Sequence, residues 1–491
     1  MRKPVVNSNK SSGGLSNLDS SSVFSIDGHP ESVPAAGWRN GSSLNNAGEN
    51  GNYWSSTPNE SNTQNAYNLN FNSGNHNVDW NNRNNGHSVR PVSELTGSPS
   101  SCHFTLTSEQ LLFDLHTAYL DARRHKRSRD YQLRFEFNLE DSLVRLRDEL
   151  YARRYKPGPS TCFIIHDPKM REVFAADFRD RVVHHLLYNY IHILFENTFI
   201  YDAYSCIEGR GTHFGINRLK HHIRSVSQGF SSPCYVLKID LKGYFMSIRR
   251  DTLFSICCKT IDKMRNHRSP DGRRWYETLD FDFVLYLLDI IVNADPLYEC
   301  RAVGDAEEWA ALPVEKSLFC SPENCGLPIG NLSSQLFSNI YLNEFDQFMK
   351  RELRCKHYGR YVDDAYVVDY DAVRLKALIR PVGEFLKNRL GLELNMRKTR
   401  IFNVNQGVEF LGAFIKPFRT YVSNSSLFRI NRKMFSKNID SPHLQSSVNS
   451  CLGVLSHYDS YCLRKVLYGY RCRLSSFGDF DKECLRFYPR L

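Results

Sequence analysis

The sequence predicts a mixed α+β protein, with a globular body from about residue 104 onward that follows an Asn-rich N-terminal segment. Three observations support this. Composition changes sharply near residue 100, several long segments of the body carry apolar residues at helical spacing, and short apolar runs between them have the length of buried strands. A chain of 491 residues has room for roughly two to four such units.

The body is basic, whereas the N-terminal segment is not. Residues 1–100 contain six Lys or Arg and seven Asp or Glu, while residues 101–491 contain 57 and 46. A basic body suits a polyanionic partner such as nucleic acid, because Lys and Arg displace the counterions of phosphates. Charge alone leaves a protein with a merely basic surface as an equal alternative.

Helical and strand patterns alternate along the body. Residues 360–370 have the form of two strands joined by a tight acidic turn. Other strands are predicted over 234–241 and 408–415. Apolar spacing predicts helices over 108–125, 139–154, 177–199, 333–354 and 371–390, and helical patterning with basic residues from about 425 onward.

The acidic turn holds the first pattern that points to chemistry, Tyr361-Val362-Asp363-Asp364. Two adjacent carboxylates at a hairpin tip repel each other and gain little from packing. Their presence is explained if a divalent cation binds there. An isolated Asp-Asp pair is more often an ordinary surface turn, so a further carboxylate is needed to decide between the two interpretations.

That further carboxylate is Asp240, at the end of the apolar strand CYVLKIDL. Opposite the hairpin tip it would complete a three-Asp cage for two metal ions. Such a cage activates a primer 3′-hydroxyl and stabilises a pyrophosphate leaving group during in-line attack. Asp240 lies about 120 residues before the Asp pair, so only the fold can bring the three together.

Four segments, in order, resemble motifs of reverse transcriptases. KIDLKGYFMSI resembles motif A, HYGRYVDDAYVVD motif C, LGLELNMRKTRIF motif D, and GVEFLGAFI motif E, the primer grip. The resemblance covers roughly residues 104–491 and implies RNA-directed DNA polymerase activity. It also implies an α+β fold of the right-hand type, with fingers and palm over 104–425, a mainly antiparallel sheet that carries the Asp residues, and a helical thumb over 426–491.

The resemblance assigns roles around the carboxylates. Asp240 and Asp363 would be the core ligands of two Mg²⁺ ions, with Mn²⁺ as a substitute, and Asp364 a supporting carboxylate. Leu241 would offer its backbone carbonyl to a metal. Lys398 matches the motif D lysine proposed to protonate pyrophosphate, although without the motif an exposed lysine is the simpler interpretation.

Three more residues are implied in nucleotide binding. Phe245, five residues past Asp240, matches the steric gate that rejects a ribose 2′-hydroxyl, and the alternative is a core aromatic residue. Arg171 matches the fingers arginine that packs over the incoming nucleotide. Lys169 is a weaker candidate for holding the triphosphate.

The segment CGLPIGNLSSQLFSNIYLNEFD narrows the resemblance to one group. Most relatives carry QG…SP here, whereas this chain has Ile329-Gly330 and then Ser334-Gln335 in the nucleotide pocket. This form, with YSCIEGRGTHFGI and SVNSCLGVLSHYDSYCLRK, resembles the diversity-generating retroelement enzymes of the group II intron and retron-like superfamily. These copy RNA with frequent misincorporation opposite adenine. Losing a polar contact near the base pair weakens the test of correct pairing, and the alternative is that Ile329 only packs.

The resemblance implies an RNA template, a DNA or RNA primer, dNTPs and a small basic accessory protein as partners. Within the enzyme class, a retron-, intron- or defence-type reverse transcriptase is the alternative. An alternative of another class is a ligand-binding fusion with an inactive polymerase body. The intact Asp240, Asp363 and Asp364 argue against an inactive body.

The N-terminal segment is interpreted in three parts. Residues 1–36 are expected to be disordered and residues 94–103 to be a linker. Residues 37–93 contain 17 Asn between Asn40 and Asn85, and 66–72 alternates like a strand. Their GWRNGS…YWSS…SVRPV framework resembles part of ligand-binding domains related to C-type lectin and formylglycine-generating-enzyme folds, typical targets of these retroelements. We interpret this part as a translated template repeat, with a functional Asn-rich binding module as the alternative.

Neither a targeting segment nor a membrane span is predicted. The start, MRKPVVNSNKSSGG, has no apolar core of a signal peptide. The longest apolar run, Phe281 to Val292, includes Asp282 and Asp289 and is too short to cross a bilayer. We therefore expect a cytoplasmic protein without membrane association.

Overall fold

The computed structural model divides the chain into two compact units, Met1–Ser101 and Cys102–Leu491. The described residues are 104–124, 129–167, 169–434, 441–466, 474 and 477–490, with the backbone of the strands between 38 and 86. The predictions of a disordered segment over 1–36 and a linker over 94–103 lie outside the described residues.

The first unit contains two small antiparallel sheets. One has the strand order β2-β1-β6 and the other β3-β4-β5. The strand predicted over 66–72 is confirmed as β4, the central strand of the second sheet. The bounds are β1 (Trp38–Asn40), β2 (Ser43–Asn45), β3 (Gly51–Pro58), β4 (Asn65–Phe71), β5 (His76–Asn82) and β6 (Asn85–Gly86).

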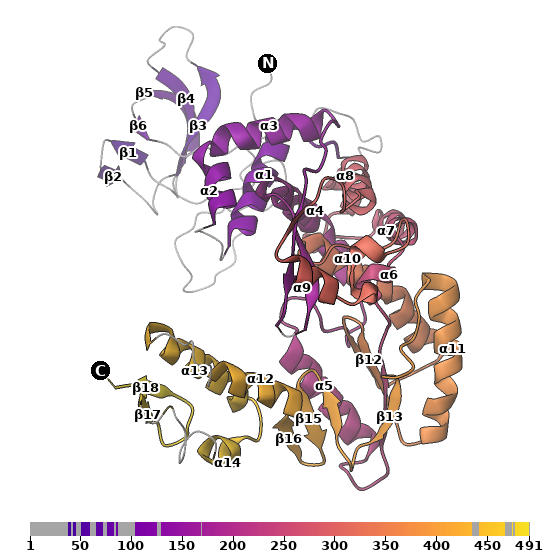
Figure 1. Ribbon diagram of the computed structural model, residues 1–491. Coiled ribbons are helices and arrows are strands. Elements are labelled where there is room, and N and C mark those ends of the chain that lie inside the picture. The colour runs from indigo at the N-terminus through magenta and orange to yellow at the C-terminus, as the bar shows by residue number, and fades with distance from the viewer. Residues whose placement is uncertain are drawn as a thin grey trace, which may run out of the picture. The chain divides into compact units, whose positions relative to one another are not determined.

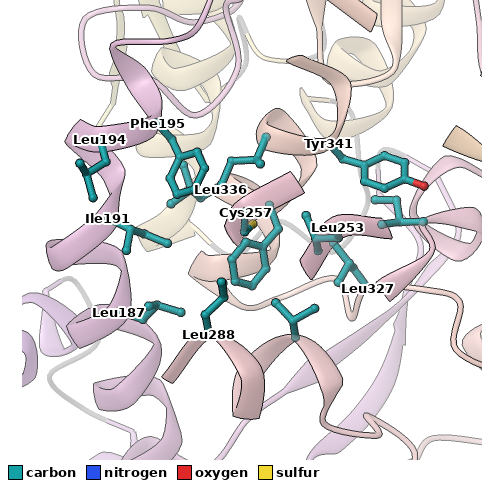
Figure 2. Packing of buried hydrophobic residues seen from close by; sticks show 14 of the residues in the cluster. Leu187, Ile191, Leu194, Phe195, Leu253, Cys257, Leu288, Leu327, Leu336 and Tyr341 are labelled. Atoms are coloured by element: carbon teal, nitrogen blue, oxygen red, sulfur yellow. The ribbon is translucent and has the colours of Figure 1, made fainter. Parts of the chain in front are cut away.

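A helical core underlies the second unit. Figure 2 shows Leu187, Ile191 and Phe195 of one long helix, α4, packed with apolar side chains of three other helices. Helices at four of the predicted places are confirmed. The core helices are α1 (Ser108–Arg123), α2 (Asp130–Phe137), α3 (Leu139–Tyr151), α4 (Phe178–Glu196), α7 (Arg250–Met264), α8 (Phe281–Asn293) and α10 (Leu332–Gln347), the last continued by a π-helical stretch at Phe348–Glu352.

The central sheet has the order β11-β12-β9-β13, and every neighbouring pair is antiparallel. Because side chains alternate across a strand, Leu237 and Val367 join the large helical core, while Val236 and Tyr366 join a second apolar cluster. Helices α11 and α5 pack against the sheet (Figure 1) and contribute to the first and second cluster respectively. The bounds are β9 (Tyr235–Ile239), β11 (Tyr358–Tyr361), β12 (Asp364–Asp369), β13 (Arg400–Asn403), α5 (Thr212–Val226) and α11 (Ala372–Leu390). The predicted acidic hairpin and the helix after it are confirmed.

A smaller three-stranded sheet has the order β10-β7-β8. Its β7 and β8 are antiparallel, whereas β10 runs parallel to β7. Two short helices lie in the connections that follow β9 and β10. The bounds are β7 (Thr161–Ile165), β8 (Arg171–Ala175), β10 (Arg301–Val303), α6 (Tyr244–Ser247) and α9 (Ala306–Ala311).

The prediction of one continuous strand over 408–415 is wrong. The chain turns at Leu411-Gly412 and forms a hairpin, with Phe410 opposite Ala413. Both turn residues have positive φ, 49° and 84°, the combination that a two-residue hairpin turn requires. Leucine is not a residue that indicates such a turn, and for this reason the sequence predicted one continuous strand. The strands are β14 (Val408–Phe410), β15 (Ala413–Lys416) and β16 (Arg419–Val422).

The C-terminal part is helical at first, as predicted, but it ends in a β-hairpin. Phe480 and Phe487 face each other across this hairpin, with ring centroids 5.1 Å apart. Phe487 is fully buried among apolar residues of the preceding helices, so tertiary packing accounts for the strands. The elements are α12 (Asn424–Met434), α13 (Ser441–Ser456), α14 (Tyr461–Arg464), β17 (Gly478–Phe480) and β18 (Phe487–Pro489).

The helices that the structure describes are too short or too polar to cross a bilayer.

Candidate active site

The pairing of β9 with β12 brings the predicted carboxylates to one end of the central sheet. Ala365 and Ile239 are the last pair of this ladder, and Asp364 and Asp240 lie one residue beyond that pair on the two segments. The charge of Asp240 acts on the pKa of both Asp363 and Asp364, so the three carboxylates lie within electrostatic range of one another. Asp363 occupies the two-residue turn that joins β11 to β12. Asp240 and the Asp363-Asp364 pair, about 120 residues apart in sequence, are thus neighbours in the fold.

Electrostatics at this end of the sheet disfavour three bare carboxylates. Burial, with the charges of Asp364 and then Asp240, raises the pKa of Asp363 from 3.8 to about 6. Burial also raises the pKa of Asp364, against the opposing effects of nearby lysines such as Lys238. Local negative charge of this kind is relieved by a bound divalent cation.

Asp240 is held by residues of the segment that precedes β13. Its Oδ1 accepts a hydrogen bond from Asn395 Nδ2 at 2.8 Å, and its Oδ2 lies 3.3 Å from Lys398 Nζ. Among the described residues, no set of three or more His, Cys, Asp or Glu side chains has the arrangement of a metal site. The carboxylate oxygens of Asp240, Asp363 and Asp364 nevertheless fit Mg²⁺ by donor type. Binding at Asp240 would exchange its ion pair with Lys398 for the metal.

Both predicted lysines act on the carboxylates. Lys398, with 60% of its side chain exposed, forms the ion pair with Asp240. Lys169 is exposed, and its charge lowers the pKa of both Asp363 and Asp364. Cationic side chains from two separate parts of the chain therefore influence the three Asp.

Phe245 and Ile329 are brought together in one apolar cluster. Both are half-buried and pack against a cluster of four buried residues: Cys162, Phe174, Met246 and Leu318. The Ile329 carbonyl accepts a hydrogen bond from the Phe174 N–H at 2.7 Å, which ties the segment to β8. Ile329 and Phe245 therefore share one packing environment.

Gly330 is required by its surroundings. Its φ is +132°, and a Cβ atom at this position would collide with the Phe174 carbonyl oxygen. Only glycine tolerates both conditions, so Gly330 allows the backbone after Ile329 to pass closely over β8.

The remaining predicted residues occupy distinct places. Arg171 is half-buried at the start of β8, with Ile165 as its partner. Leu241 is buried and forms an isolated bridge with Leu394. Gln335 is exposed in the first turn of α10.

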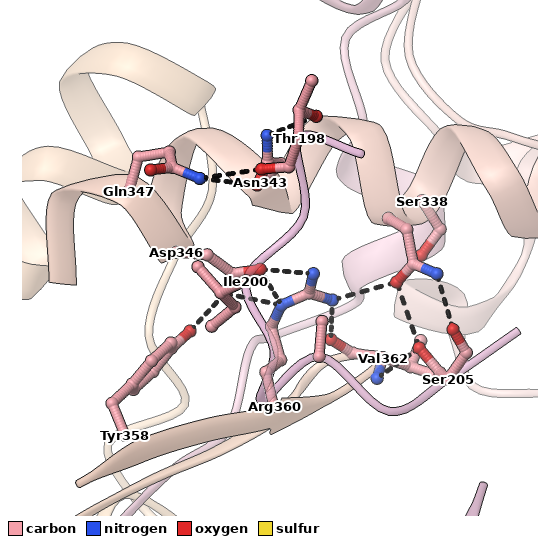
Figure 3. A network of polar contacts seen from close by, with 12 residues as sticks. Thr198, Ile200, Ser205, Ser338, Asn343, Asp346, Gln347, Tyr358, Arg360 and Val362 are labelled. Atoms are coloured by element: carbon pink, nitrogen blue, oxygen red, sulfur yellow. Dashed lines mark hydrogen bonds and ion pairs between the residues drawn. The ribbon is translucent and has the colours of Figure 1, made fainter. Parts of the chain in front are cut away.

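A buried ion pair lies directly behind the acidic turn (Figure 3). Arg360 Nε and Nη2 donate to Asp346 at 2.8 and 2.7 Å, and Tyr358 Oη donates to the same carboxylate at 2.6 Å. Arg360 also donates from Nη1 to the Val362 carbonyl at 2.9 Å. Arg360 and Asp346 are at most 1% exposed. Sequence reasoning missed this pair, and it missed Asn395 beside Asp240. Arg360, which directly precedes the turn motif, could have been singled out from the sequence, but its distant partner Asp346 could not.

Comparisons with known proteins find similarity over the part of the chain that carries these residues. The sequence model of the family described as Reverse transcriptase (RNA-dependent DNA polymerase) matches residues 165–415. A second model, Domain of unknown function (DUF8237), matches residues 29–92. Protein YkfC of Escherichia coli (strain K12) is 26% identical over 301 residues, which cover 54% of this chain and 69% of that protein.

Similar solved structures include telomerases from two Candida species. Telomerase from Candida albicans, in complex with a TWJ fragment of telomeric RNA, is 12% identical with a TM-score of 0.39, and the match covers 65% of this chain and 60% of that one. Apo telomerase from Candida tropicalis is 12% identical with a TM-score of 0.40, and the match covers 60% and 52%. The chain thus spans little more than half the length of either telomerase.

The raised pKa of Asp363 predicts that Asp363→Asn stabilises the metal-free protein above pH 6. Below pH 3.8 the carboxyl group is protonated in both folded and unfolded states and contributes nothing. As the pH rises towards 6 the unfolded state loses its proton first, so the folded wild type loses stability. We expect an advantage for the variant of about 2–3 kcal/mol at pH 7.5 in EDTA, falling towards zero at pH 4, in urea unfolding.

Saturating Mg²⁺ should remove most of that advantage, because an ion that binds only the folded wild type adds about 2.7 kcal/mol at 100 times its Kd. A variant less stable than wild type at pH 7.5 in EDTA would contradict this electrostatic account.

Proposed function

The chain belongs to the reverse transcriptase (RNA-dependent DNA polymerase) family, and we propose that it is the error-prone polymerase of a diversity-generating retroelement. The observation that carries the polymerase assignment is the pairing of β9 with β12, whose last pair, Ala365 and Ile239, is followed by Asp364 and Asp240, beside the turn with Asp363. In this proposal the enzyme copies an RNA template into DNA and often misincorporates opposite adenine.

In the proposed mechanism Asp240 and Asp363 would hold Mg²⁺, and Asp364 would support them. Bound divalent ions supply activation of the primer 3′-hydroxyl and stabilisation of the leaving pyrophosphate. Lys398 neutralises Asp240 before substrate binds and is then available to donate a proton to pyrophosphate. Arg171 packs over the incoming nucleotide, Lys169 helps to hold the triphosphate, and Phe245 excludes a ribose 2′-hydroxyl.

We assign the template–primer duplex to the basic surface of the C-terminal helices. A hollow of about 890 Å³ is lined by Thr212 and His213 of α5 and by Arg429, Arg432 and Lys433 of α12. Guanidinium and ammonium groups here suit phosphate contacts, which bind a duplex by its backbone rather than by its sequence.

Ile329 supports the error-prone assignment. It stands where most relatives have an amide, and its contacts are with an apolar cluster that includes Phe245. An apolar side chain offers no hydrogen bond to test the geometry of the base pair, so mispairs are rejected less strongly. A retron-, intron- or defence-type enzyme, the alternative, would not concentrate its errors at adenine.

We further propose that residues 37–93 are the translated template repeat. The 17 Asn between Asn40 and Asn85 support this, because Asn codons begin with two adenines, whose random replacement yields many residue types. The competing interpretation, a functional binding module, is supported by the two antiparallel sheets and by the match to a domain family.

Polymerase activity should depend on the acidic turn. In primer extension on RNA with Mg²⁺ and dNTPs, Asp363→Ala should reduce the rate at least about 100-fold. Losing a residue that only supports a metal ligand costs up to about 100-fold, and losing the ligand itself should cost no less. Asp369→Ala, at the far end of the same strand, is the matched control and should retain activity. Equal activity in wild type and Asp363→Ala would refute the assignment, and an inactive wild type would favour the binding-protein alternative.

Restoring an amide at residue 329 should improve fidelity at adenine. One hydrogen bond is worth about 0.5–1.5 kcal/mol, so Ile329→Gln should lower misincorporation opposite template adenine roughly 3- to 10-fold, measured by sequencing the products. Ile329→Leu keeps the position apolar and should leave the error spectrum unchanged. If both variants err at adenine as often as wild type, Ile329 serves packing alone.

The gene itself tests the template-repeat proposal. We expect the Asn codons of residues 40–85 to be mostly AAC, which cannot become a stop codon by changes at adenine alone. A near-copy that differs at adenines should lie in the flanking DNA. Mixed Asn codons, or no such copy, would leave the binding module as the better interpretation.

A further inference from the structure

The backbone of the acidic turn has an unusual conformation at Val362. Its φ is +53°, a left-handed value that is strained for a β-branched residue. Such a conformation persists only where the surroundings hold it in place. Val362 immediately precedes Asp363, so its conformation decides where that carboxylate points.

Side chains bind both polar groups of the Val362 backbone. Its N–H donates to Ser205 Oγ at 3.1 Å, and its carbonyl accepts from Arg360 Nη1 at 2.9 Å. These bonds come from side chains rather than from the strand ladder. The turn is therefore clamped from two sides, as Figure 3 shows for Ser205, Arg360 and Val362.

Asn339 joins the two clamping side chains. Ser205 Oγ donates to Asn339 Oδ1 at 3.0 Å, and Asn339 Nδ2 donates back to the Ser205 carbonyl at 2.7 Å. The same Oδ1 accepts from Arg360 Nη1 at 3.3 Å. Ser205, Asn339 and Arg360 are each at most 2% exposed, so water cannot replace these bonds readily.

We propose that Ser205 and Asn339 are positioning residues, which hold the turn so that the Asp363 carboxylate is presented to the metal. Ser205 lies in the segment YSCIEGRGTHFGI, and Asn339 lies in the middle of α10. Neither residue touches substrate or metal in this role, and both act through Val362. The inference rests on the proposed function, because it presumes that Asp363 is a metal ligand.

The test compares Ser205→Ala and Asn339→Ala with Asn343→Ala. Asn343 lies one helical turn further along α10, and its Nδ2 donates to Thr198 Oγ1 at 3.2 Å instead of serving the acidic turn. Four quantities are measured on the full chain: Mn²⁺ affinity by electron paramagnetic resonance, Tm, kcat, and KM for dNTP.

We expect Ser205→Ala and Asn339→Ala to weaken Mn²⁺ binding and to lower kcat by roughly 10- to 100-fold, as the loss of outer partners of metal ligands does. The KM for dNTP should stay within about twofold, because substrate contacts are unchanged. Asn343→Ala should leave Mn²⁺ affinity and kcat at wild-type values. Ser205→Ala removes a single oxygen atom, so it decides the question even if Asn339→Ala fails to fold.

Wild-type Mn²⁺ affinity and kcat in both Ser205→Ala and Asn339→Ala would overturn this inference and leave the proposed function intact. A wild-type chain that neither binds Mn²⁺ nor extends a primer would instead overturn the proposed function, and the inference with it.

Discussion

The antiparallel pairing of β9 with β12 is the constraint on which the site depends. Asp364 and Asp240 lie one residue beyond its last pair, Ala365 and Ile239, and the turn adds Asp363. Like charges opposite each other weaken a sheet, so the arrangement costs stability unless a cation binds. The pKa of Asp363, raised by burial and by its two acidic neighbours, is a direct consequence. A protein that served stability alone would not retain three carboxylates there.

The turn is fixed from behind by an interaction of a different kind. Arg360 and Asp346 are buried together, and such a pair is costly to break because the remaining charge would have no partner. The same guanidinium bonds the Val362 carbonyl, so the free energy of the ion pair also enforces the conformation of the turn. The carboxylates thus have rigid support behind them and adjustable contacts in front, such as that of Asp240 with Lys398. This combination suits a site that exchanges its ligands.

Much of this could be predicted from local sequence, and the rest could not. The acidic hairpin and the strand before Asp240 are predicted by short apolar runs of strand length, the former joined by a tight acidic turn, and the order of the motifs implies the family. The hairpin at 408–416 was missed because Leu411 adopts a positive φ that no local signal announces. The terminal strands were missed because Phe487 is buried by distant helices. The partners of Arg360 and Asp240, namely Asp346 and Asn395, are set by tertiary packing, which sequence spacing does not encode.

The central claim is that Asp240 and Asp363 share divalent metal ions next to a nucleotide. Anomalous diffraction from crystals grown with Mn²⁺, a template–primer duplex and a non-hydrolysable dNTP measures this most directly. The account predicts Mn²⁺ peaks bound by both carboxylates, with Lys398 displaced from Asp240. Mn²⁺ bound elsewhere, with the Lys398–Asp240 ion pair intact beside the nucleotide, would contradict it.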